Sequence, residues 1–226
     1  QKAGVEIFYD RAAFLDPHTV QLKKNGKKIP AGHFLIATGG HPSHELDTIE
    51  GASCCITSNE AFHLKDLPRR VVIAGGGYIG VEFAHIFHGL GSDVTLICRN
   101  PKVLRGFDED IRDCLMAEMH TNGIRVLAER TISRVDQKGD ARFVFTSKGE
   151  MIEADCVMLA IGRHPNTRGL GLDKAGVKMG KHEAIVVDEY SKTVVDHIYA
   201  IGDVTDRLQL TPVAIHEAMC FVKTVF

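Results

Sequence analysis

The chain has 226 residues, with 27 lysines and arginines against 29 aspartates and glutamates, so its formal charge at pH 7 is −2. It contains no long basic run, and nothing in its charge pattern predicts contact with nucleic acid or with an anionic membrane surface. The longest apolar stretches, at 71–81 and 156–162, are shorter than the roughly 20 residues that a membrane-spanning helix needs. The length and a hydrophobic share of 44% predict a globular protein of one or two domains.

The six cysteines are typical of buried, reduced, structural thiols. None of them forms a CxxC or CxxxxC spacing, and the adjacent pair Cys54 and Cys55 would close only a strained disulfide. The twelve histidines lack cysteine or acidic residues at metal-ligand spacing, so we predict no metal site. The cysteine usage predicts a cytoplasmic protein. The chain starts at Gln1 without an apolar leader, which we interpret as an internal piece of a longer protein.

Short strands are predicted in the first part of the chain, at 5–10, 19–23 and 28–40. An Asn-Gly step between the last two predicts a hairpin turn. A helix is predicted at 58–67, with Ser58 as its N-cap and Pro68 as its end.

Strand and helix then alternate. Apolar runs and helical periodicity predict strand, helix, strand, helix and strand at 71–75, 78–90, 93–99, 108–121 and 124–128. The predicted apolar faces are Ile79, Phe83, Ile86, Phe87 and Leu90 in the first helix and Ile111, Leu115 and Met119 in the second. This order predicts a βαβ unit of Rossmann type.

The pattern changes to period two between 131 and 153, which predicts a small antiparallel meander. A buried strand at 155–162 follows the meander. Two further strands are predicted at 184–188 and 198–203, and a helix begins at Pro212. The fold predicted from these elements is α/β, with a Rossmann-like three-layer domain that carries an inserted antiparallel meander.

The sequence GGGYIG at 75–80 lies between a buried strand and an amphipathic helix, the context in which a GxGxxG motif binds a dinucleotide. Gly75 permits a tight turn, Gly77 lets the backbone approach a pyrophosphate, and Gly80 lets the helix pack closely on the strand. The free N–H groups at the start of the helix would face the anion. We therefore prefer a nucleotide site here to a purely structural glycine-rich turn.

The end of the second strand predicts which nucleotide is bound. NAD-binding domains carry an acid about 20 residues after the glycines. In this chain Cys98 and Arg99 occupy that position, and Arg105 follows. Two guanidinium groups suit the 2′-phosphate of NADPH, because arginine binds phosphate as a planar fork. The alternative is that both arginines are ordinary solvated surface residues.

Six segments resemble, in the same order, motifs of the pyridine nucleotide-disulfide oxidoreductases, and within that family those of the glutathione-disulfide reductases. They are ATGG (37–40), GGGYIGVE (75–82), RNPKVLRGFDEDIRD (99–113), AIGRHPNT (160–167), VDEYSKT (187–193) and AIGDVTDRLQLTPVA (200–214). The resemblance implies an NADPH-binding domain at 44–163. It also implies part of a second, similar domain that binds FAD, present here as residues 1–43 and 164–226.

The resemblance implies roles for individual residues. NADPH would contact Gly75, Gly76, Gly77, Tyr78, Ile79, Gly80, Glu82, Arg99, Arg105, Gly162, Arg163 and Gln209. FAD would contact Ala12, Thr38, Gly39, Asp203 and Thr211. Tyr78 resembles the ring that shields the flavin, and Asp203 resembles the carboxylate that binds its ribityl hydroxyl. Gly80 departs from the pattern of the NADPH-using members of the family, which often have alanine at this position. This glycine favours NADH.

The resemblance also implies an FAD flavoprotein that reduces glutathione disulfide with NADPH as a homodimer, without nucleic acid or membrane as a partner. The family's first FAD-binding GxGxxG, its CxxxxC redox pair and its C-terminal catalytic histidine have no counterpart in this sequence. We therefore assign no catalytic residue to this chain and expect it not to turn over a disulfide alone. Two alternatives remain: a module that binds NADPH without catalysis, and a related reductase for dihydrolipoamide, trypanothione or mercuric ion.

Overall fold

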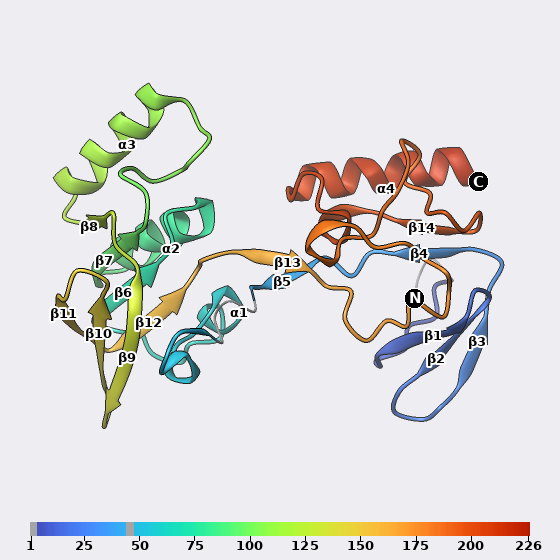
Figure 1. Ribbon diagram of the computed structural model, residues 1–226, viewed down its shortest axis with the longest axis horizontal. Helices are drawn as coiled ribbons and strands as arrows, with labels where there is room; N and C mark the ends of the chain where they lie inside the picture. The colour runs from blue at the N-terminus through green and yellow to red at the C-terminus, as the bar shows by residue number, and fades with distance from the viewer. Residues whose placement is uncertain (1–3, 44–47) are drawn as a thin grey trace. The chain divides into compact units, whose positions relative to one another are not determined.

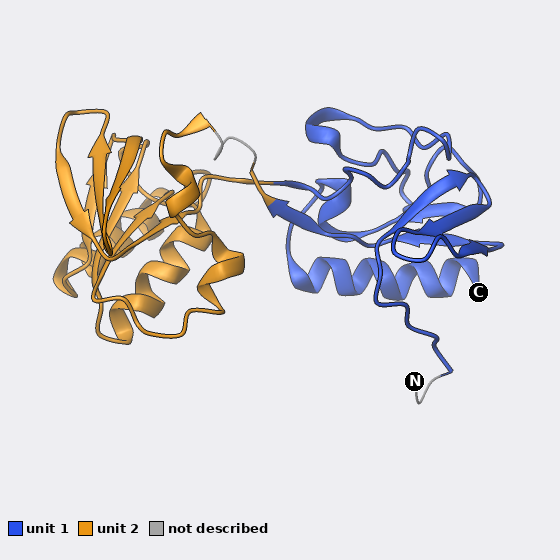
Figure 2. Ribbon diagram, turned by 90° about the horizontal axis from the view of Figure 1, so that it is seen from below, with its two compact units in different colours: residues 1–41, 164–226 blue, residues 42–163 orange. Residues whose placement is uncertain are grey.

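The computed structural model describes residues 4–43 and 48–226 and divides into two compact units (Figure 1). Unit 1 contains residues 1–41 and 164–226, and unit 2 contains residues 42–163 (Figure 2). The chain passes between the units twice, along β5 (Gly40–Pro42) and β13 (Arg163–Pro165), which pair with each other. Unit 2 is therefore an insertion in the sequence of unit 1.

Unit 2 is built on a four-stranded parallel sheet in the order β12-β6-β7-β8. Its strands are β6 (Arg70–Ala74), β7 (Asp93–Cys98), β8 (Arg125–Ala128) and β12 (Cys156–Leu159). The helix α2 (Tyr78–Gly89) connects β6 to β7, and α3 (Glu109–Thr121) connects β7 to β8. The strand and helix alternation predicted for this part of the chain is confirmed.

A three-stranded antiparallel sheet in the order β11-β10-β9 forms the third layer of unit 2. Its strands are β9 (Ile132–Lys138), β10 (Ala141–Thr146) and β11 (Met151–Ala154). Successive residues of β6 face opposite sides of the parallel sheet. Val71 and Ile73 pack in the core shared with α2 and α3, while Val72 and Ala74 pack in the core shared with Val144 of the meander. The predicted three-layer arrangement with its meander is confirmed.

The helices of unit 2 bury faces that differ in part from the predicted ones. In α2, Ile86 is 47% exposed, and Leu90, which is the C-cap of this helix, is 64% exposed, whereas Val81 is buried. In α3, Ile111 is 58% exposed, and the neighbouring Arg112 is only 8% exposed. The prediction placed the apolar residues at helical spacing on the buried face, whereas the face that a helix buries is set by its rotation against the sheet. The burial of a charged residue in α3 needs polar partners, which are described below.

Unit 1 combines a small antiparallel sheet, a parallel pair and one long helix. The antiparallel sheet contains β1 (Ala12–Asp16), β2 (Thr19–Leu22) and β3 (Lys28–Pro30) in sequence order. The parallel pair is β4 (Phe34–Ile36) with β14 (Ile198–Ala200), and the helix is α4 (Thr211–Val225). The hairpin predicted from the Asn-Gly step joins β2 to β3, so this prediction is confirmed.

Several predicted strands of unit 1 are wrong or shorter than expected. Residues 5–10 form no strand, and Val5, Ile7 and Tyr9 are more than half exposed. Alternating apolar residues make a strand only where a partner strand and a core accept them. The predicted strand at 28–40 is divided into β3, β4 and β5 by short turns. Residues 184–188 form no strand beyond an isolated bridge at Ile185.

The helix predicted at 58–67 is confined to the single turn α1 (Ser58–Ala61). Its N-cap is Thr57 and not Ser58, because Thr57 and Glu60 form a reciprocal capping box. Short 3-10 helices occur at Ala52–Cys54, Lys181–Glu183 and Gly202–Thr205. Within the part of the chain that the structure describes, no helix is both long and apolar enough to cross a bilayer.

Candidate functional site

The candidate site of unit 2 lies at the carboxyl ends of its parallel strands. The chain leaves β6 toward β7 on one side, and β12 lies on the other side of β6. The strand order therefore reverses between β6 and β12, and open parallel sheets bind ligands outside the carboxyl ends of the strands at such a reversal. Gly75 follows β6 directly, and Ala160 follows β12. The glycine-rich segment 75–80 therefore stands at this edge of the sheet.

The glycines at 75, 76 and 80 are required by close backbone packing. A Cβ atom on Gly75 would lie 2.1 Å from the carbonyl oxygen of Ala160, and one on Gly80 would lie 1.9 Å from the carbonyl oxygen of Gly75. A Cβ atom on Gly76 would lie 2.7 Å from the Cβ atom of Cys98. The close contact at Gly80 gives a steric reason for glycine at this position, independent of the choice between NADH and NADPH.

Gly77 differs from these three glycines because a Cβ atom there would meet nothing within 4 Å. Gly77 is the N-cap of α2 and provides no side chain to the free N–H groups of the first turn. That first turn also contains no acidic residue. The N-terminus of α2 therefore presents unsatisfied N–H donors and the positive end of the helix dipole to open space, which is an arrangement that binds anions.

Two exposed arginines lie on the segment that leaves the neighbouring strand. Arg99 follows β7, and Arg105 lies six residues later. Among the described residues, at least six other arginines form ion pairs, whereas neither Arg99 nor Arg105 has a side-chain hydrogen bond or ion pair there. Burial raises the pKa of the Cys98 thiol, so this group adds no negative charge beside the glycines. Both guanidinium groups at this edge are therefore available to an anion.

The remaining predicted nucleotide contacts of unit 2 lie on the same elements. Tyr78 and Ile79 form the start of α2, where the Tyr78 side chain is 41% exposed, and Glu82 lies in the next turn. Gly162 and Arg163 follow β12. The structure thus brings the carboxyl ends of β6, β7 and β12 together, as the sequence predicts for a nucleotide site, while each residue's contact with a nucleotide stays a prediction.

Sequence reasoning missed a hydrogen bond that joins the glycine segment to the arginine segment. The N–H group of Leu104 donates to the carbonyl oxygen of Gly76 over 2.7 Å. Leu104 has a φ of 52°, a left-handed conformation that is uncommon for leucine. It also missed the buried Arg112 of α3, which bonds to this same segment. The sequence signal that could have indicated Arg112 was a charged residue next to Ile111, on the predicted apolar face of this helix.

Three predicted residues lie together at one end of the long helix of unit 1. Thr211 begins α4, whose N-terminus has no side-chain cap. Asp203 lies in the preceding 3-10 helix, Gly202–Thr205, and its carboxylate has no hydrogen-bond partner among the described residues. Gln209 lies between them and donates from its amide to the carboxylate of Asp206 over 2.8 Å. An unsatisfied carboxylate and an uncapped helix N-terminus are therefore close in sequence.

The other predicted residues of unit 1 lie at strand ends. The hydroxyl of Thr38 donates to the carbonyl oxygen of Asn166 over 2.8 Å, and the N–H group of Asn166 donates to the carbonyl oxygen of Gly39 over 2.9 Å. Gly39 has a φ of 68°, which favours glycine. Ala12 is the first residue of β1 and pairs with Leu22.

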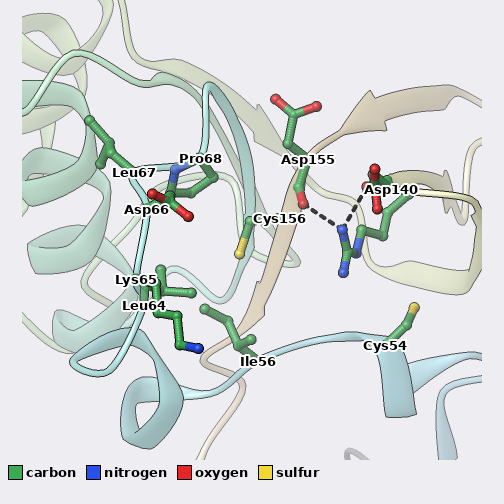
Figure 3. Close-up of a pocket in the computed structure, with 11 residues that line it drawn as sticks. Cys54, Ile56, Leu64, Lys65, Asp66, Leu67, Pro68, Asp140, Asp155 and Cys156 are labelled. Carbon is green, nitrogen blue, oxygen red and sulfur yellow. Dashed lines mark hydrogen bonds between the residues drawn. The ribbon is translucent and has the colours of Figure 1, made fainter.

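A cavity of about 530 Å³ lies in unit 2 at the amino ends of β6 and β12 (Figure 3). Arg142 lines this cavity and donates from Nη1 to the carbonyl oxygens of Asp140 and Asp155. Burial raises the pKa of the Cys156 thiol in its wall to about 11, so that thiol is protonated at neutral pH. Because this cavity is at the opposite strand ends from Gly75, it is separate from the candidate site.

No group of three or more histidine, cysteine, aspartate or glutamate side chains among residues 4–43 and 48–226 is placed to hold a metal ion. Cys54 and Cys55 are half-buried, Cys98 and Cys156 are buried, and Cys114 and Cys220 are exposed. The interpretation of the cysteines as buried is therefore wrong for the last two.

Comparisons with known proteins agree with this geometry. Residues 1–218 match the family model for pyridine nucleotide-disulphide oxidoreductases. The chain is 44% identical to a glutathione reductase of a Nostoc species, covering 100% of this chain and 51% of that protein. It is 44% identical to a trypanothione reductase of Leishmania donovani, covering 99% of this chain and 47% of that protein.

Solved structures of disulfide reductases also resemble this chain. An HOCl-induced flavoprotein disulfide reductase of Escherichia coli superimposes with a TM-score of 0.88 at 28% identity, covering 95% of this chain and 49% of that one. The chain thus spans about half the length of the relatives that it matches. The family match covers nearly all of the described residues, including the glycine segment, the arginine segment and the start of α4. The chain therefore belongs to the pyridine nucleotide-disulphide oxidoreductase family.

Proposed function

We propose that the chain is part of an FAD-dependent disulfide reductase that uses NADPH, with glutathione disulfide as the substrate. Residues 44–163 would form the NADPH-binding domain, and residues 1–43 and 164–226 would form part of the FAD domain. The observation that carries the nucleotide assignment is the pair of exposed, unpaired guanidinium groups of Arg99 and Arg105 beside an anion-binding helix N-terminus.

The residues of unit 2 fit a dinucleotide phosphate. Gly77 leaves open space where a pyrophosphate would approach the backbone, and the first N–H groups of α2 would donate to it. Arg99 and Arg105 would each offer a fork of donors to a 2′-phosphate. Tyr78 would cover the nicotinamide side, because its exposed ring stands at the first residue of α2. Ile79, Glu82, Gly162 and Arg163 would complete this proposed contact set.

The residues of unit 1 fit a flavin at the start of α4. The carboxylate of Asp203 would accept a hydrogen bond from a ribityl hydroxyl, and the free N–H groups near Thr211 would face a partly negative ring edge. Ala12, Thr38, Gly39 and Gln209 would add the remaining contacts. Bound FAD would supply the two-electron chemistry that connects NADPH to a disulfide.

The substrate and the assembly are proposed from relatives alone. The glutathione reductase and the trypanothione reductase reported above are equally identical to this chain, so the sequence does not separate their substrates. We propose glutathione disulfide because two glutathione reductases match over the whole chain. We propose a homodimer from the family resemblance and a cytoplasmic location from the cysteine usage. The sequence contains no CxxxxC pair, so thiols from outside this chain would have to reduce the disulfide.

Calorimetric titration with NADPH and NADH tests the nucleotide assignment. We expect NADPH to bind more tightly, with each arginine contact contributing roughly 1.5 to 3 kcal/mol. Arg99→Gln and Arg105→Gln should each weaken NADPH binding by about tenfold or more and leave NADH binding unchanged. Arg125→Gln is the matched control, because Arg125 is an exposed arginine of the same unit on β8. Equal affinities of the unaltered chain for the two nucleotides would contradict the assignment.

A specific observation supports a second candidate function, that of an NADPH-binding module without catalysis. The redox pair is absent from this sequence, and the flavin residues of unit 1 lie beside a parallel sheet of only two described strands. We expect the chain to be purified without flavin and to oxidise no NADPH when glutathione disulfide is added. A yellow preparation that keeps its visible absorbance through dialysis, or turnover that depends on the disulfide, would contradict this expectation.

A further inference from the structure

The segment 99–107, which carries both unpaired arginines, has an irregular conformation that its own sequence does not enforce. It connects β7 to α3, and Leu104 adopts a φ of 52° in it. A left-handed conformation at a residue with a branched side chain persists only where surrounding contacts hold it. Contacts that hold this segment therefore also determine where Arg105, the residue after Leu104, presents its guanidinium group.

Two of these contacts attach the segment to the core of unit 2. The side chain of Val103 is 0% exposed and packs with the residues of β6 and β7. The N–H group of Leu104 donates to the carbonyl oxygen of Gly76, as described above. The arginine segment and the glycine segment therefore share a fixed hydrogen bond between their backbones.

The third contact comes from Arg112, which is only 8% exposed. Its Nε atom donates to the carbonyl oxygen of Val103 over 2.8 Å, and its Nη2 atom donates to the carbonyl oxygen of Lys102 over 3.3 Å. Its Nη1 atom bonds to the carboxylate of Glu109. One planar guanidinium group thus satisfies two consecutive carbonyl groups of the segment, one in a buried and one in a partly buried hydrogen bond.

A network of charges holds Arg112 in this orientation. Glu109 also accepts from Lys102 over 3.0 Å, and Lys102 forms a second ion pair with Asp113. The hydrogen bond from Lys102 lowers the pKa of Glu109, so this carboxylate stays charged at neutral pH. Glu109, Arg112 and Asp113 all lie on the first turns of α3. The helix therefore fixes the segment through one buried cation and its acidic neighbours.

We propose that Arg112 is a positioning residue for nucleotide selectivity, which holds the 102–104 backbone so that Arg105 can meet the 2′-phosphate of NADPH. This inference rests on the proposed nucleotide site, but it assigns a role to a residue outside that site. Arg112 is buried behind the segment and donates its bonds to the protein backbone, so it acts through Arg105 and not on the nucleotide itself. Loss of Arg112 should weaken NADPH binding more than NADH binding.

The experiment compares four proteins, each with the complete chain: the unaltered protein, Arg112→Met, Arg112→Lys and the control Arg142→Met. Methionine keeps the apolar stem without a donor, and lysine keeps the charge but cannot bond both carbonyl groups as a fork. Arg142 is matched to Arg112, because it also donates to two backbone carbonyl groups of unit 2, but at the opposite strand ends. The measured quantity is the ratio of the NADH to the NADPH dissociation constant.

We expect this ratio to fall about tenfold in Arg112→Met and at least about threefold in Arg112→Lys, in line with the loss of hydrogen bonds from a charged donor. Arg142→Met should leave the ratio unchanged, even if it lowers stability. Amide exchange of Leu104 in the nucleotide-free protein should accelerate in both Arg112 variants and not in the control. This second readout applies to any variant that folds, whatever its affinity.

The outcomes distinguish failure of the proposed NADPH site from failure of the positioning role of Arg112. A ratio of one in the unaltered protein would overturn the proposed NADPH site, and the positioning role with it. A clear NADPH preference that Arg112→Met does not change would overturn the positioning role alone. The positioning role would also be overturned if Arg112→Lys kept the full NADPH preference while Arg112→Met lost that preference. This result would show that the charge of residue 112, and not its hydrogen bonds to the backbone, determines the preference.

Discussion

The two units bury their helices to different extents. α2 of unit 2 has 12 residues and buries five of them, whereas α4 of unit 1 has 15 residues and buries only Phe221. Ile215, Met219 and Val222 on α4 are each more than half exposed. The parallel sheet has four strands in unit 2 and two described strands in unit 1. Unit 2 thus surrounds its core with its own elements, while unit 1 leaves apolar surface uncovered.

This difference has a consequence for the proposed sites. The glycine segment and the arginine segment rest on Ile73, Leu96 and Val103, which are fully buried in unit 2. Each such side chain contributes roughly 1.5 to 3 kcal/mol through burial, so the backbone at the proposed nucleotide site is well supported. The proposed flavin residues near Thr211 instead begin a helix whose apolar face is open. Exposed apolar surface of this kind marks a contact surface.

The same substitution in two helices gives the largest expected contrast between the units. Met119 on α3 is 0% exposed and Met219 on α4 is 55% exposed. We expect Met119→Ala to lower the free energy of unfolding of unit 2 by about 2 to 5 kcal/mol, because it leaves a cavity. Met219→Ala should change stability by no more than about 0.5 kcal/mol. Urea unfolding followed by circular dichroism measures both. A large cost for Met219→Ala would mean that the face of α4 is covered.

Amide hydrogen exchange should separate the units without any mutation. We expect the amides of β6, β7 and β12 to exchange most slowly, because these strands lie between two layers of unit 2. Amides of β14 and α4 should exchange at least about 100-fold faster, because less of unit 1 must open to expose them. Mass spectrometry of peptides from each element provides the measurement. Equal protection in both units would show that unit 1 is as stable as unit 2.

The parts of the fold that the sequence predicted well are those in which local and long-range signals agree. The strand β6 contains a continuous apolar run at 71–74, which follows two arginines and ends before Gly75. Such a run predicts a strand that is buried on both faces. Unit 1 was predicted less well. Its short strands depend on distant partners, as in the pairing of β4 with β14, and a sequence pattern does not identify such partners.

The candidate site shows the same division between local and distant information. The glycine segment has a local signature, since its spacing relates directly to the packing of Gly75 and Gly80 on nearby backbone. Arg112 has none. Its role depends on the rotation of α3 and on the path of residues 102–104, and both are set by tertiary packing. The helical spacing of apolar residues therefore selected Ile111, which is exposed, and passed over Arg112.

The exposed face of α4 should cause self-association of the chain at high concentration. Met219→Lys places a charge at the centre of this face and should weaken the association by about tenfold, because burying a methionine side chain is favourable and burying a lysine ammonium is not. Met151→Lys is the matched control, because Met151 is a methionine of unit 2 that is 57% exposed on β11. Sedimentation velocity measures the effect. Equal weakening by both substitutions would indicate association through general hydrophobicity.

Acid should affect unit 2 more than unit 1, although the effect is the smallest of those expected. Among the described residues, the carboxyl groups whose pKa is lowered all lie in unit 2: Glu60, Glu109, Glu150 and Asp155. The pKa of Asp155 is lowered mainly by hydrogen bonds from Arg70, which joins β6 to the start of β12.

A carboxyl group whose pKa is lower in the folded state than in the unfolded state stabilises the protein above its unfolded pKa of about 4, and this stabilisation is lost as the pH falls through the folded value. Unit 2 should therefore lose stability below about pH 4 more steeply than unit 1. Asp155→Asn should remove part of that pH dependence at a cost of about 1 kcal/mol or less at pH 7, because the pair is partly solvated. Asp196→Asn in unit 1 is the control, since its carboxylate is 94% exposed in its pair with Lys192. Amide exchange of each unit between pH 3 and pH 7 measures the difference (roughly the range over which carboxylates titrate). An equal acid response of the two units would show that the pair of Arg70 with Asp155 contributes little to the stability of the parallel sheet of unit 2.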